Sequence, residues 1–214
     1  MTKQRSSEDL TQALRGLAPP RAAASTAASA ASTRFAEAAM ADGLADVAFW
    51  IEASPVGDLL VAVTRSGLVR IAYADETREG VLAHLARTVS PRIVESAAAT
   101  DTVRRELEEY FAGSRVTFDL RVDRRLIHGV ARDVLAATSR VPFGSTTTYG
   151  ELARRIGKPK AARAVGNALG SNPIPIIIPC HRVLRAGGAL GGYAGGFARK
   201  ERLLTLEGVS LRRS

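Results

Sequence analysis

The sequence predicts an α+β fold, in which an N-terminal antiparallel sheet with its helix is followed by a helical domain. Short apolar runs within residues 47–75 are broken by "SPVGD" and "TRSGL", which is typical of β-hairpins. "ETREGVLAHLARTV" then places apolar residues at helical spacing. Later, "STTTYGELARRIGKPKAARAVGNALGSN" contains two short helical patterns joined by "GKP", as in a helix-turn-helix. We therefore expect two domains, over residues 47–122 and 123–214, after an Ala-rich extension over residues 1–46.

The extension has two parts, and we assign no chemistry to either. "SSEDLTQALRGLAPP" predicts a short capped helix that is stopped by prolines. The alanine-rich stretch that follows is low in complexity and fits a helix, a linker or both.

The charge of the chain is concentrated in its second half. The formal net charge is +9. Residues 1–100 hold 10 Lys/Arg and 11 Asp/Glu, whereas residues 101–214 hold 20 Lys/Arg and 10 Asp/Glu. This asymmetry suggests a polyanionic partner for the second half, although a solvated basic face would give the same count.

Several classes of protein are disfavoured by composition. No stretch approaches the length of a membrane span, and the first thirty residues lack the apolar segment of a secretory signal. The single cysteine cannot form an internal disulfide, so we expect a cytoplasmic protein without a membrane partner. One cysteine and three histidines (His84, His128, His181) do not favour a closed zinc site, and we expect neither a metal nor a cofactor. We interpret His84 and His128 as ordinary structural or exposed residues.

The segment between the two domains adds further elements. "PRIVESA" is compatible with another strand, and "TDTVRRELEEYFAG" predicts a helix capped by Thr100 or Asp101. Farther along, Thr148 can cap a helix over Tyr149–Ile156, with Glu151 at the capping-box position.

The second helix of the helix-turn-helix, predicted over roughly residues 160–169, has an unusual surface. Six of its positions, up to the glycine that ends it, carry very small residues: Ala161, Ala162, Ala164, Gly166, Ala168 and Gly170. Small residues allow a backbone to approach a surface closely, which suits a narrow groove better than base reading by long side chains.

The single thiol lies in "NPIPIIIPCHRV", residues 172–183. Pro173 and Pro175 cannot donate to a sheet ladder, so we expect a stiff buried segment rather than a strand. A lone cysteine is often only a small buried side chain, but His181 and Arg182 supply basic groups that could activate Cys180. Adjacent side chains of an extended chain point in opposite directions, so contact with His181 needs a turn or a bridging water.

The chain after the thiol is rich in glycine. Six glycines surround Tyr193 in "RAGGALGGYAGGFARK", which fits either a loop that wraps a flat ligand or a mobile loop. "RKERLLTLEG" predicts a helix that ends at Gly208, with Glu207 at its C-terminus. The acids downstream of the thiol are Glu201 and Glu207, and a histidine base is commonly oriented by a carboxylate.

These segments together resemble a known family. "TYGELA…GKPKAARAVG", "NPIPIII", "PCHRV" and "GGYAGG" occur in the order and at the spacing of the O6-alkylguanine-DNA alkyltransferases, also called methylated-DNA–protein-cysteine methyltransferases. The resemblance covers roughly residues 48–208 and is strongest over residues 142–208. It implies a ribonuclease H-like N-terminal domain and a winged helix-turn-helix DNA-binding domain. It also implies a monomer that binds double-stranded DNA, flips out O6-alkylguanine or O4-alkylthymine, and transfers the alkyl group irreversibly to itself.

The resemblance also implies roles for individual residues. Cys180 is the alkyl acceptor, His181 the water-mediated base, Glu207 the carboxylate that orients it, and Asn172 the brace of the active-site turn. The implied substrate contacts are Tyr149, Tyr193, Ala194 and the carbonyls of Cys180 and Val183. The implied DNA contacts are Arg163, which enters the base stack, together with Lys160, Ala161, Ala162 and Gly166. Family members often have serine or glycine where this chain has Ala194, which could alter the substrate range.

Three other functions remain open at this point. A thiol hydrolase would also use a cysteine and a histidine, but it needs an oxyanion hole. A non-catalytic lesion sensor of the same fold would lack the cysteine. A regulator triggered by its own methylation would need a further segment, for which residues 1–46 are available.

Overall fold

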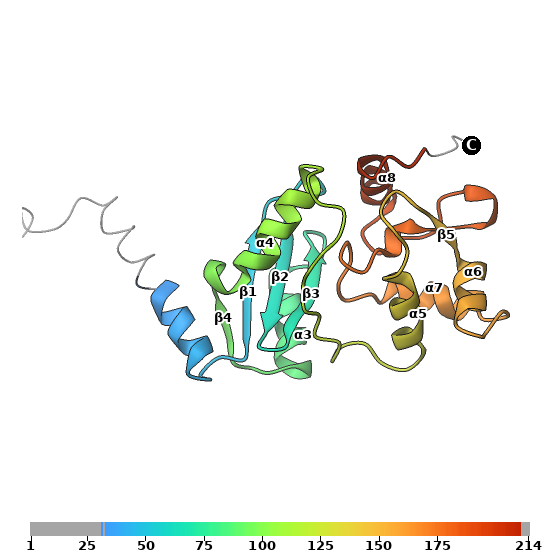
Figure 1. Ribbon diagram of the computed structural model, residues 1–214. Helices are drawn as coiled ribbons and strands as arrows, with labels where there is room; N and C mark the ends of the chain where they lie inside the picture. Colours follow the sequence, from blue (N-terminus) through green and yellow to red (C-terminus); the bar gives the residue numbers. More distant parts are fainter. Residues whose placement is uncertain (1–30, 32, 211–214) are drawn as a thin grey trace, which may run out of the picture.

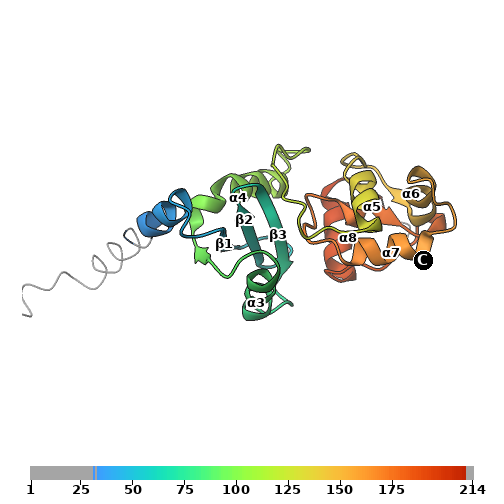
Figure 2. The ribbon, with the colours of Figure 1, turned by 90° about the horizontal axis from the view of Figure 1, so that it is seen from below.

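The structure is a computed structural model that describes residue 31 and residues 33–210. Two halves lie side by side along the molecule, one built on a sheet and the other mainly helical (Figure 1), as a perpendicular view confirms (Figure 2). The helix predicted within residues 6–20 lies outside the described residues. Residues 33–41 are helical, so this part of the alanine-rich stretch is a helix. No helix in the described part of the chain is both long and apolar enough to cross a membrane.

The sheet contains β1 (Val47–Glu52), β2 (Leu59–Thr64) and β3 (Gly67–Tyr73), which pair antiparallel as the hairpin signals predict. β4 (Ile93–Glu95) joins the edge of the sheet in parallel with β1, so the sheet is mixed rather than wholly antiparallel. The reason is α3 (Arg78–Thr88), which connects β3 to β4. A helical crossover of this kind returns the chain in the same direction.

Different elements cover the two faces of the sheet. Leu60 and Ala62 of β2 belong to a cluster that includes buried residues of α3. Leu59 and Val61 point to the other face, into a cluster that includes buried residues of α4 (Ala97–Phe111). Because both faces are covered, β2 is buried along its whole length.

α4 begins earlier than the sequence predicts. Ser96 is its N-cap rather than Thr100 or Asp101, because the Ser96 hydroxyl accepts a hydrogen bond from the Ala99 backbone N–H at 3.2 Å. Residues 97–99 are alanines, which are strong helix formers and extend the helix back to this cap.

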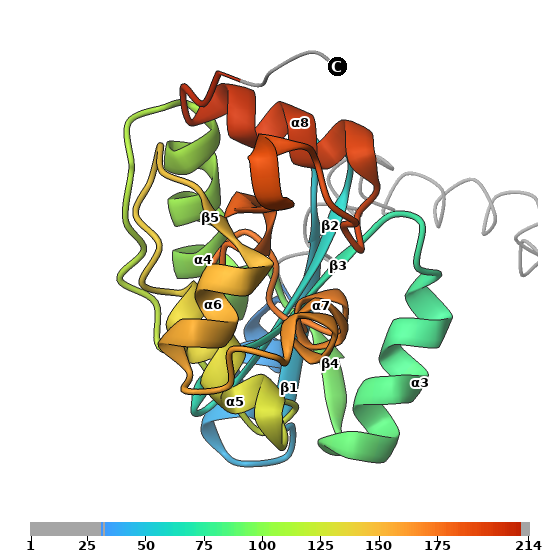
Figure 3. The same ribbon diagram turned by 90° about the vertical axis from the view of Figure 1, so that its right-hand side faces the viewer.

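The C-terminal half contains helices around a small parallel sheet (Figure 3). Its elements are α5 (Val130–Thr138), β5 (Thr147–Thr148), α6 (Tyr149–Arg155), α7 (Ala162–Gly170), η1 (Cys180–Arg182), β6 (Val183–Leu184), η2 (Ala186–Gly188) and α8 (Phe197–Leu206). β5 pairs with β6, and α7 packs against both α5 and α6.

The two helices of the helix-turn-helix differ in how well the sequence predicts them. α6 has the predicted capping box, because Thr148 and Glu151 each bind the backbone N–H of the other. α7 begins at Ala162, two residues after the predicted start, because Lys160 lies in the preceding turn and Ala161 is the N-cap without a capping side chain.

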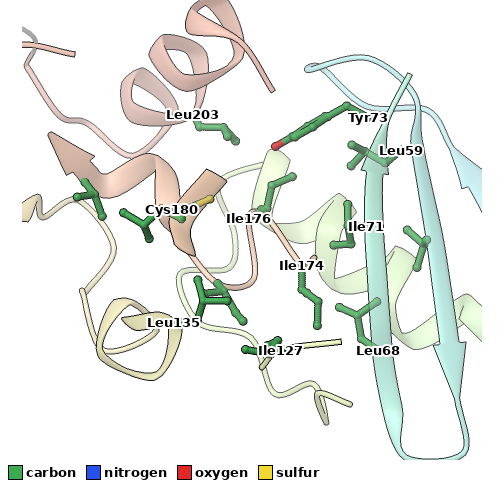
Figure 4. Close-up of a cluster of buried hydrophobic side chains, with 14 of the residues drawn as sticks. Leu59, Leu68, Ile71, Tyr73, Ile127, Leu135, Ile174, Ile176, Cys180 and Leu203 are labelled. Atoms are coloured by element: carbon green, nitrogen blue, oxygen red, sulfur yellow. The ribbon is translucent and has the colours of Figure 1, made fainter. Parts of the chain in front are cut away.

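The apolar cluster that contains Leu59 and Val61 extends from the sheet into the C-terminal half and joins the two halves (Figure 4). Ile71 and Tyr73 of β3 pack with Ile174 and Ile176 of the C-terminal half. The backbone N–H of Ile71 also donates to the carbonyl of Pro173 at 2.9 Å. The segment that leads to the thiol therefore rests directly on the sheet.

Candidate active site

Cys180 stands at the end of an irregular buried segment, residues 172–179, as predicted. Asn172 holds this segment at both ends: its Oδ1 accepts from the Ile174 N–H at 3.0 Å and its Nδ2 donates to the Ile178 carbonyl at 2.9 Å. The same Nδ2 lies 3.2 Å from Cys180 Sγ. Ile176 has a φ of 74°, a conformation that a β-branched side chain rarely adopts. Asn172 thus fixes the sulfur at one place in a backbone that is not regular.

The thiol needs help to ionise. Cys180 is buried, and burial raises its pKa, while the Asn172 hydrogen bond and the positive charge of Lys200 act in the opposite direction. A thiol whose pKa lies above its usual value is mostly protonated near neutral pH, so a nearby base is required.

His181 is placed to act as that base. The 3₁₀ turn η1 supplies the turn that the sequence requires between neighbouring side chains. His181 Nε2 lies 2.8 Å from Glu207 Oε1, and because a carboxylate accepts only, Nε2 must carry the proton. Burial lowers the pKa of His181 even though Glu207 raises it, so the ring is neutral and Nδ1 is an acceptor. Nδ1 is buried and has no hydrogen-bond partner among the described residues.

Glu207, the C-cap of α8, is the buried anion of the site. Arg182 donates to both of its oxygens at 2.8 Å, and the hydroxyl of Tyr110 donates to Oε1 at 2.7 Å. Burial alone would raise the pKa of Glu207, but the hydrogen bonds from His181, Arg182 and Tyr110 lower it to about 2. Arg182 therefore neutralises Glu207 and does not face the thiol.

Lys200 is a site residue that sequence reasoning missed. Its side chain is fully buried, and its Nζ donates to the carbonyls of Val183 at 2.5 Å and Gly191 at 3.3 Å. Burial lowers its pKa to about 8. Within the helical pattern "ARKERLL" it looks like any exposed lysine, so no local signal distinguishes it. The carbonyl of Val183, predicted to contact substrate, is therefore bound to Lys200.

A cavity of about 650 Å³ opens over the sulfur. Its lining combines the thiol, the helix of small residues and the glycine-rich loop: Tyr149, Ala162, Arg163, Gly166, Asn167, Leu169, Gly170, Cys180, Arg185, Gly192, Tyr193 and Ala194. The structure thus brings most of the predicted substrate and DNA contacts together with Cys180. Lys160, Ala161 and Val183 do not line the cavity.

The glycine-rich loop packs closely against two tyrosines. A Cβ on Gly191 would collide with the Tyr149 hydroxyl, and a Cβ on Gly195 would collide with the ring of Tyr73. Tyr73, which sequence reasoning also missed, lies with its hydroxyl 2.5 Å from that of Tyr193. A residue of the N-terminal half therefore supports the wall of the cavity.

Comparisons with known proteins agree with this geometry. Residues 51–124 match the family model of the 6-O-methylguanine DNA methyltransferase ribonuclease-like domain, and residues 129–209 match that of its DNA-binding domain. A methylated-DNA–protein-cysteine methyltransferase of Mycolicibacterium paratuberculosis is 42% identical over 154 residues, which are 72% of this chain and 88% of that protein. The chain belongs to this family. A relative from Methanosarcina acetivorans is 41% identical over 155 residues, with 72% and 94% coverage.

Solved structures of the family have the same fold. The O6-methylguanine methyltransferase of Mycobacterium tuberculosis has a TM-score of 0.65 and 39% identity, and covers 75% of this chain and 92% of that one. A crystal structure of Mycobacterium tuberculosis OGT in complex with DNA matches equally well. The predicted α+β class, with a ribonuclease-like and a DNA-binding half, is therefore confirmed.

Proposed function

We propose that this protein repairs DNA by moving the alkyl group of O6-alkylguanine to Cys180, once per molecule. The observation that carries the proposal is the position of the only cysteine, at a cavity that also contains Tyr149, Tyr193 and Arg163, beside a His181–Glu207 pair. A cavity of about 650 Å³ is within the usual range for small-molecule pockets and can hold a single flipped base.

The chemistry is one displacement at carbon. The proton of the Cys180 thiol passes to Nδ1 of His181 through a bridging water, and Glu207 stabilises the resulting imidazolium. The sulfur forms a bond to the alkyl carbon while the bond from that carbon to O6 breaks. The released electron pair stays on the guanine, which takes up the proton from His181. The thioether product has no route back to a thiol, so the protein is consumed.

The partner is double-stranded DNA that contains the alkylated base. The base must leave the stack, at a cost of about a few kcal/mol, and Arg163 on α7 is long and planar enough to fill the gap. The exposed Ala162 and the half-buried Gly166 allow the backbone of α7 to approach the groove. We expect Lys160, in the turn before α7, and Ala161, the N-cap of α7, to contact the flanking DNA backbone. Because small side chains offer few hydrogen bonds to base edges, sequence preference should be slight.

The roles of the remaining residues follow the same proposal. Asn172 holds the turn, and Tyr149, Tyr193 and Ala194 contact the base. The carbonyls of Cys180 and Val183 accept from its amino group, although the second already binds Lys200. Because Ala194 has no hydroxyl to offer O6, the range of alkyl groups should differ from that of relatives with serine. We also propose that the protein acts as a monomer in the cytoplasm.

The experiment is a single-turnover assay on a duplex with one O6-methylguanine labelled in its methyl group. The label should move from DNA to protein without added cofactor, and the same duplex labelled instead at a thymine methyl should transfer nothing. Release of the label as methanol would favour hydrolysis, and label that stays in a bound duplex would favour a lesion sensor. Either result would overturn the proposal.

A further inference from the structure

Tyr110 connects the ribonuclease-like half to the His181–Glu207 pair. It is fully buried on α4, 97 residues from its partner in sequence, and its hydroxyl donates to Glu207 Oε1 at 2.7 Å. Its ring packs against Phe111, Phe118 and Phe143, with ring centroids 5.3 to 6.1 Å apart. Such packing leaves the hydroxyl little freedom to point elsewhere.

The oxygen that Tyr110 binds is the one that faces the histidine. Glu207 Oε1 accepts from His181 Nε2 at 2.8 Å and from Arg182 Nη2 at 2.8 Å, as well as from Tyr110. Burial, and then the charge of Glu207, raise the pKa of Tyr110 far above its usual value. The hydroxyl therefore remains a donor throughout the pH range in which the protein works.

A donor on Oε1 has two physical effects. It fixes the plane of the carboxylate, and with it the direction of the bond to His181 Nε2. It also draws negative charge from the oxygen that would otherwise raise the proton affinity of the imidazole. The first effect keeps the imidazole of His181 correctly oriented before the reaction, and the second keeps its Nδ1 free of a proton.

We propose that Tyr110 is a positioning residue for alkyl transfer, through which the ribonuclease-like half sets the orientation and basicity of the Glu207–His181 pair. This inference rests on the proposed function. It assigns to the N-terminal half a part in the chemistry of a cysteine that lies in the other half.

Several other groups act on His181, and they must stay unchanged in a test. The titratable and charged groups around it are Cys180 and Arg182 on its own turn, Lys200 on α8, Glu207 at its C-cap, Tyr110 on α4 and Tyr193 in the glycine-rich loop. A change confined to the Tyr110 hydroxyl leaves the other five in place.

The variant Tyr110→Phe removes only the hydroxyl. The rate of single-turnover transfer from an O6-methylguanine duplex should reach a plateau at high pH that stays within about threefold of the wild-type value. The acid limb of the pH–rate profile, where the rate falls as His181 takes up a proton, should move to higher pH by roughly half to one pH unit. Replacement of Tyr110 by a difluorotyrosine, a stronger donor of nearly the same shape, should move the acid limb down instead. It also serves if Tyr110→Phe does not fold.

The matched control is Phe118→Leu, which loosens the packing around the same ring and keeps the hydroxyl bond. It should lower the unfolding midpoint and leave the acid limb at the wild-type pH. The inference is overturned if the limb does not move in Tyr110→Phe, if the difluorotyrosine does not move it, or if Phe118→Leu moves it equally. A wild-type protein that transfers no methyl group overturns the proposed function as well, so the two failures are distinct.

Discussion

Glu207→Gln tests the electrostatics of the buried site. The substitution keeps the size of the side chain but replaces a carboxylate that accepts from His181, Arg182 and Tyr110. An amide has one acceptor oxygen, and its NH₂ group would face donors. The guanidinium of Arg182, which is also buried, would lose its counter-charge.

The structure gives the size and sign of the effect on stability. The pKa of Glu207 is lowered from 4.5 to about 2 in the folded protein. Each unit corresponds to about 1.4 kcal/mol, so the carboxylate contributes about 3 kcal/mol relative to its protonated form. Because the folded pKa is the lower one, this contribution is complete above the unfolded pKa and is lost as the pH falls from 4.5 toward 2.

Urea unfolding of both proteins at several pH values measures this contribution. We expect Glu207→Gln to be less stable by about 3 kcal/mol at neutral pH, with the difference shrinking below pH 4.5. Burial lowers the pKa of His181 and Glu207 partly offsets this, so protonation of His181 below its unfolded pKa destabilises both proteins, Glu207→Gln the more, and widens the difference before Glu207 begins to titrate. A stability difference that is absent, or constant down to pH 3, would show that the Glu207 carboxylate does not make this contribution.

The same variant tests the catalytic role of the pair. Without the carboxylate the imidazolium has no anionic partner, so transfer should slow by about tenfold or more while DNA affinity stays near the wild-type value. If the mutant matches the wild-type rate from acid to alkaline pH, Glu207 does not assist His181.

Three further variants separate other parts of the site. Lys200→Met removes a buried ammonium that lowers the pKa of Cys180, so alkylation of the thiol by iodoacetamide should require higher pH; an unchanged pH dependence would exclude this effect. Arg163→Lys should slow repair of duplex DNA by about tenfold but spare free O6-benzylguanine, which needs no flipping; equal defects on both substrates would disprove intercalation. Tyr73→Phe removes the partner of the Tyr193 hydroxyl and should raise the rate of benzyl transfer relative to methyl transfer. An unaltered ratio of the two rates would show that the wall of the cavity does not depend on the hydrogen bond between the two tyrosines.

Sequence patterns predicted those elements that are determined by interactions between residues close together in the chain. The capping box of Thr148 and Glu151 is confirmed because it involves residues only three apart. The prolines before Cys180 correctly excluded a strand, since they remove the donors that a ladder needs. The parallel pairing of β4 was not predicted, because its direction depends on the crossover by α3 rather than on the strand's own residues.

Long-range contacts account for what the sequence could not predict. Tyr110 and Tyr73 belong to ordinary helical and strand patterns, and their importance arises only when the two halves pack together. Lys200 also lies in an ordinary helical pattern, and its role depends on α8 packing against Val183 and Gly191 within the C-terminal half. The roles of the predicted site residues came from the family resemblance, and they stay predictions, as does the division of the chain at residue 122. Arg182 shows the limit of reading neighbours in sequence, because its side chain binds Glu207 rather than activating the adjacent thiol.

Mass analysis of the protein after reaction tests directly whether Cys180 accepts the alkyl group, once per molecule. The wild-type protein and Cys180→Ser are each incubated with an excess of O6-methylguanine duplex. The intact mass of each protein is measured by mass spectrometry, and the protein is then digested for peptide mapping. We expect one methyl group per wild-type molecule, all of it on Cys180, and none on Cys180→Ser, which should still bind the duplex. A methyl group on another residue, or more than one guanine repaired per protein molecule, would contradict this expectation.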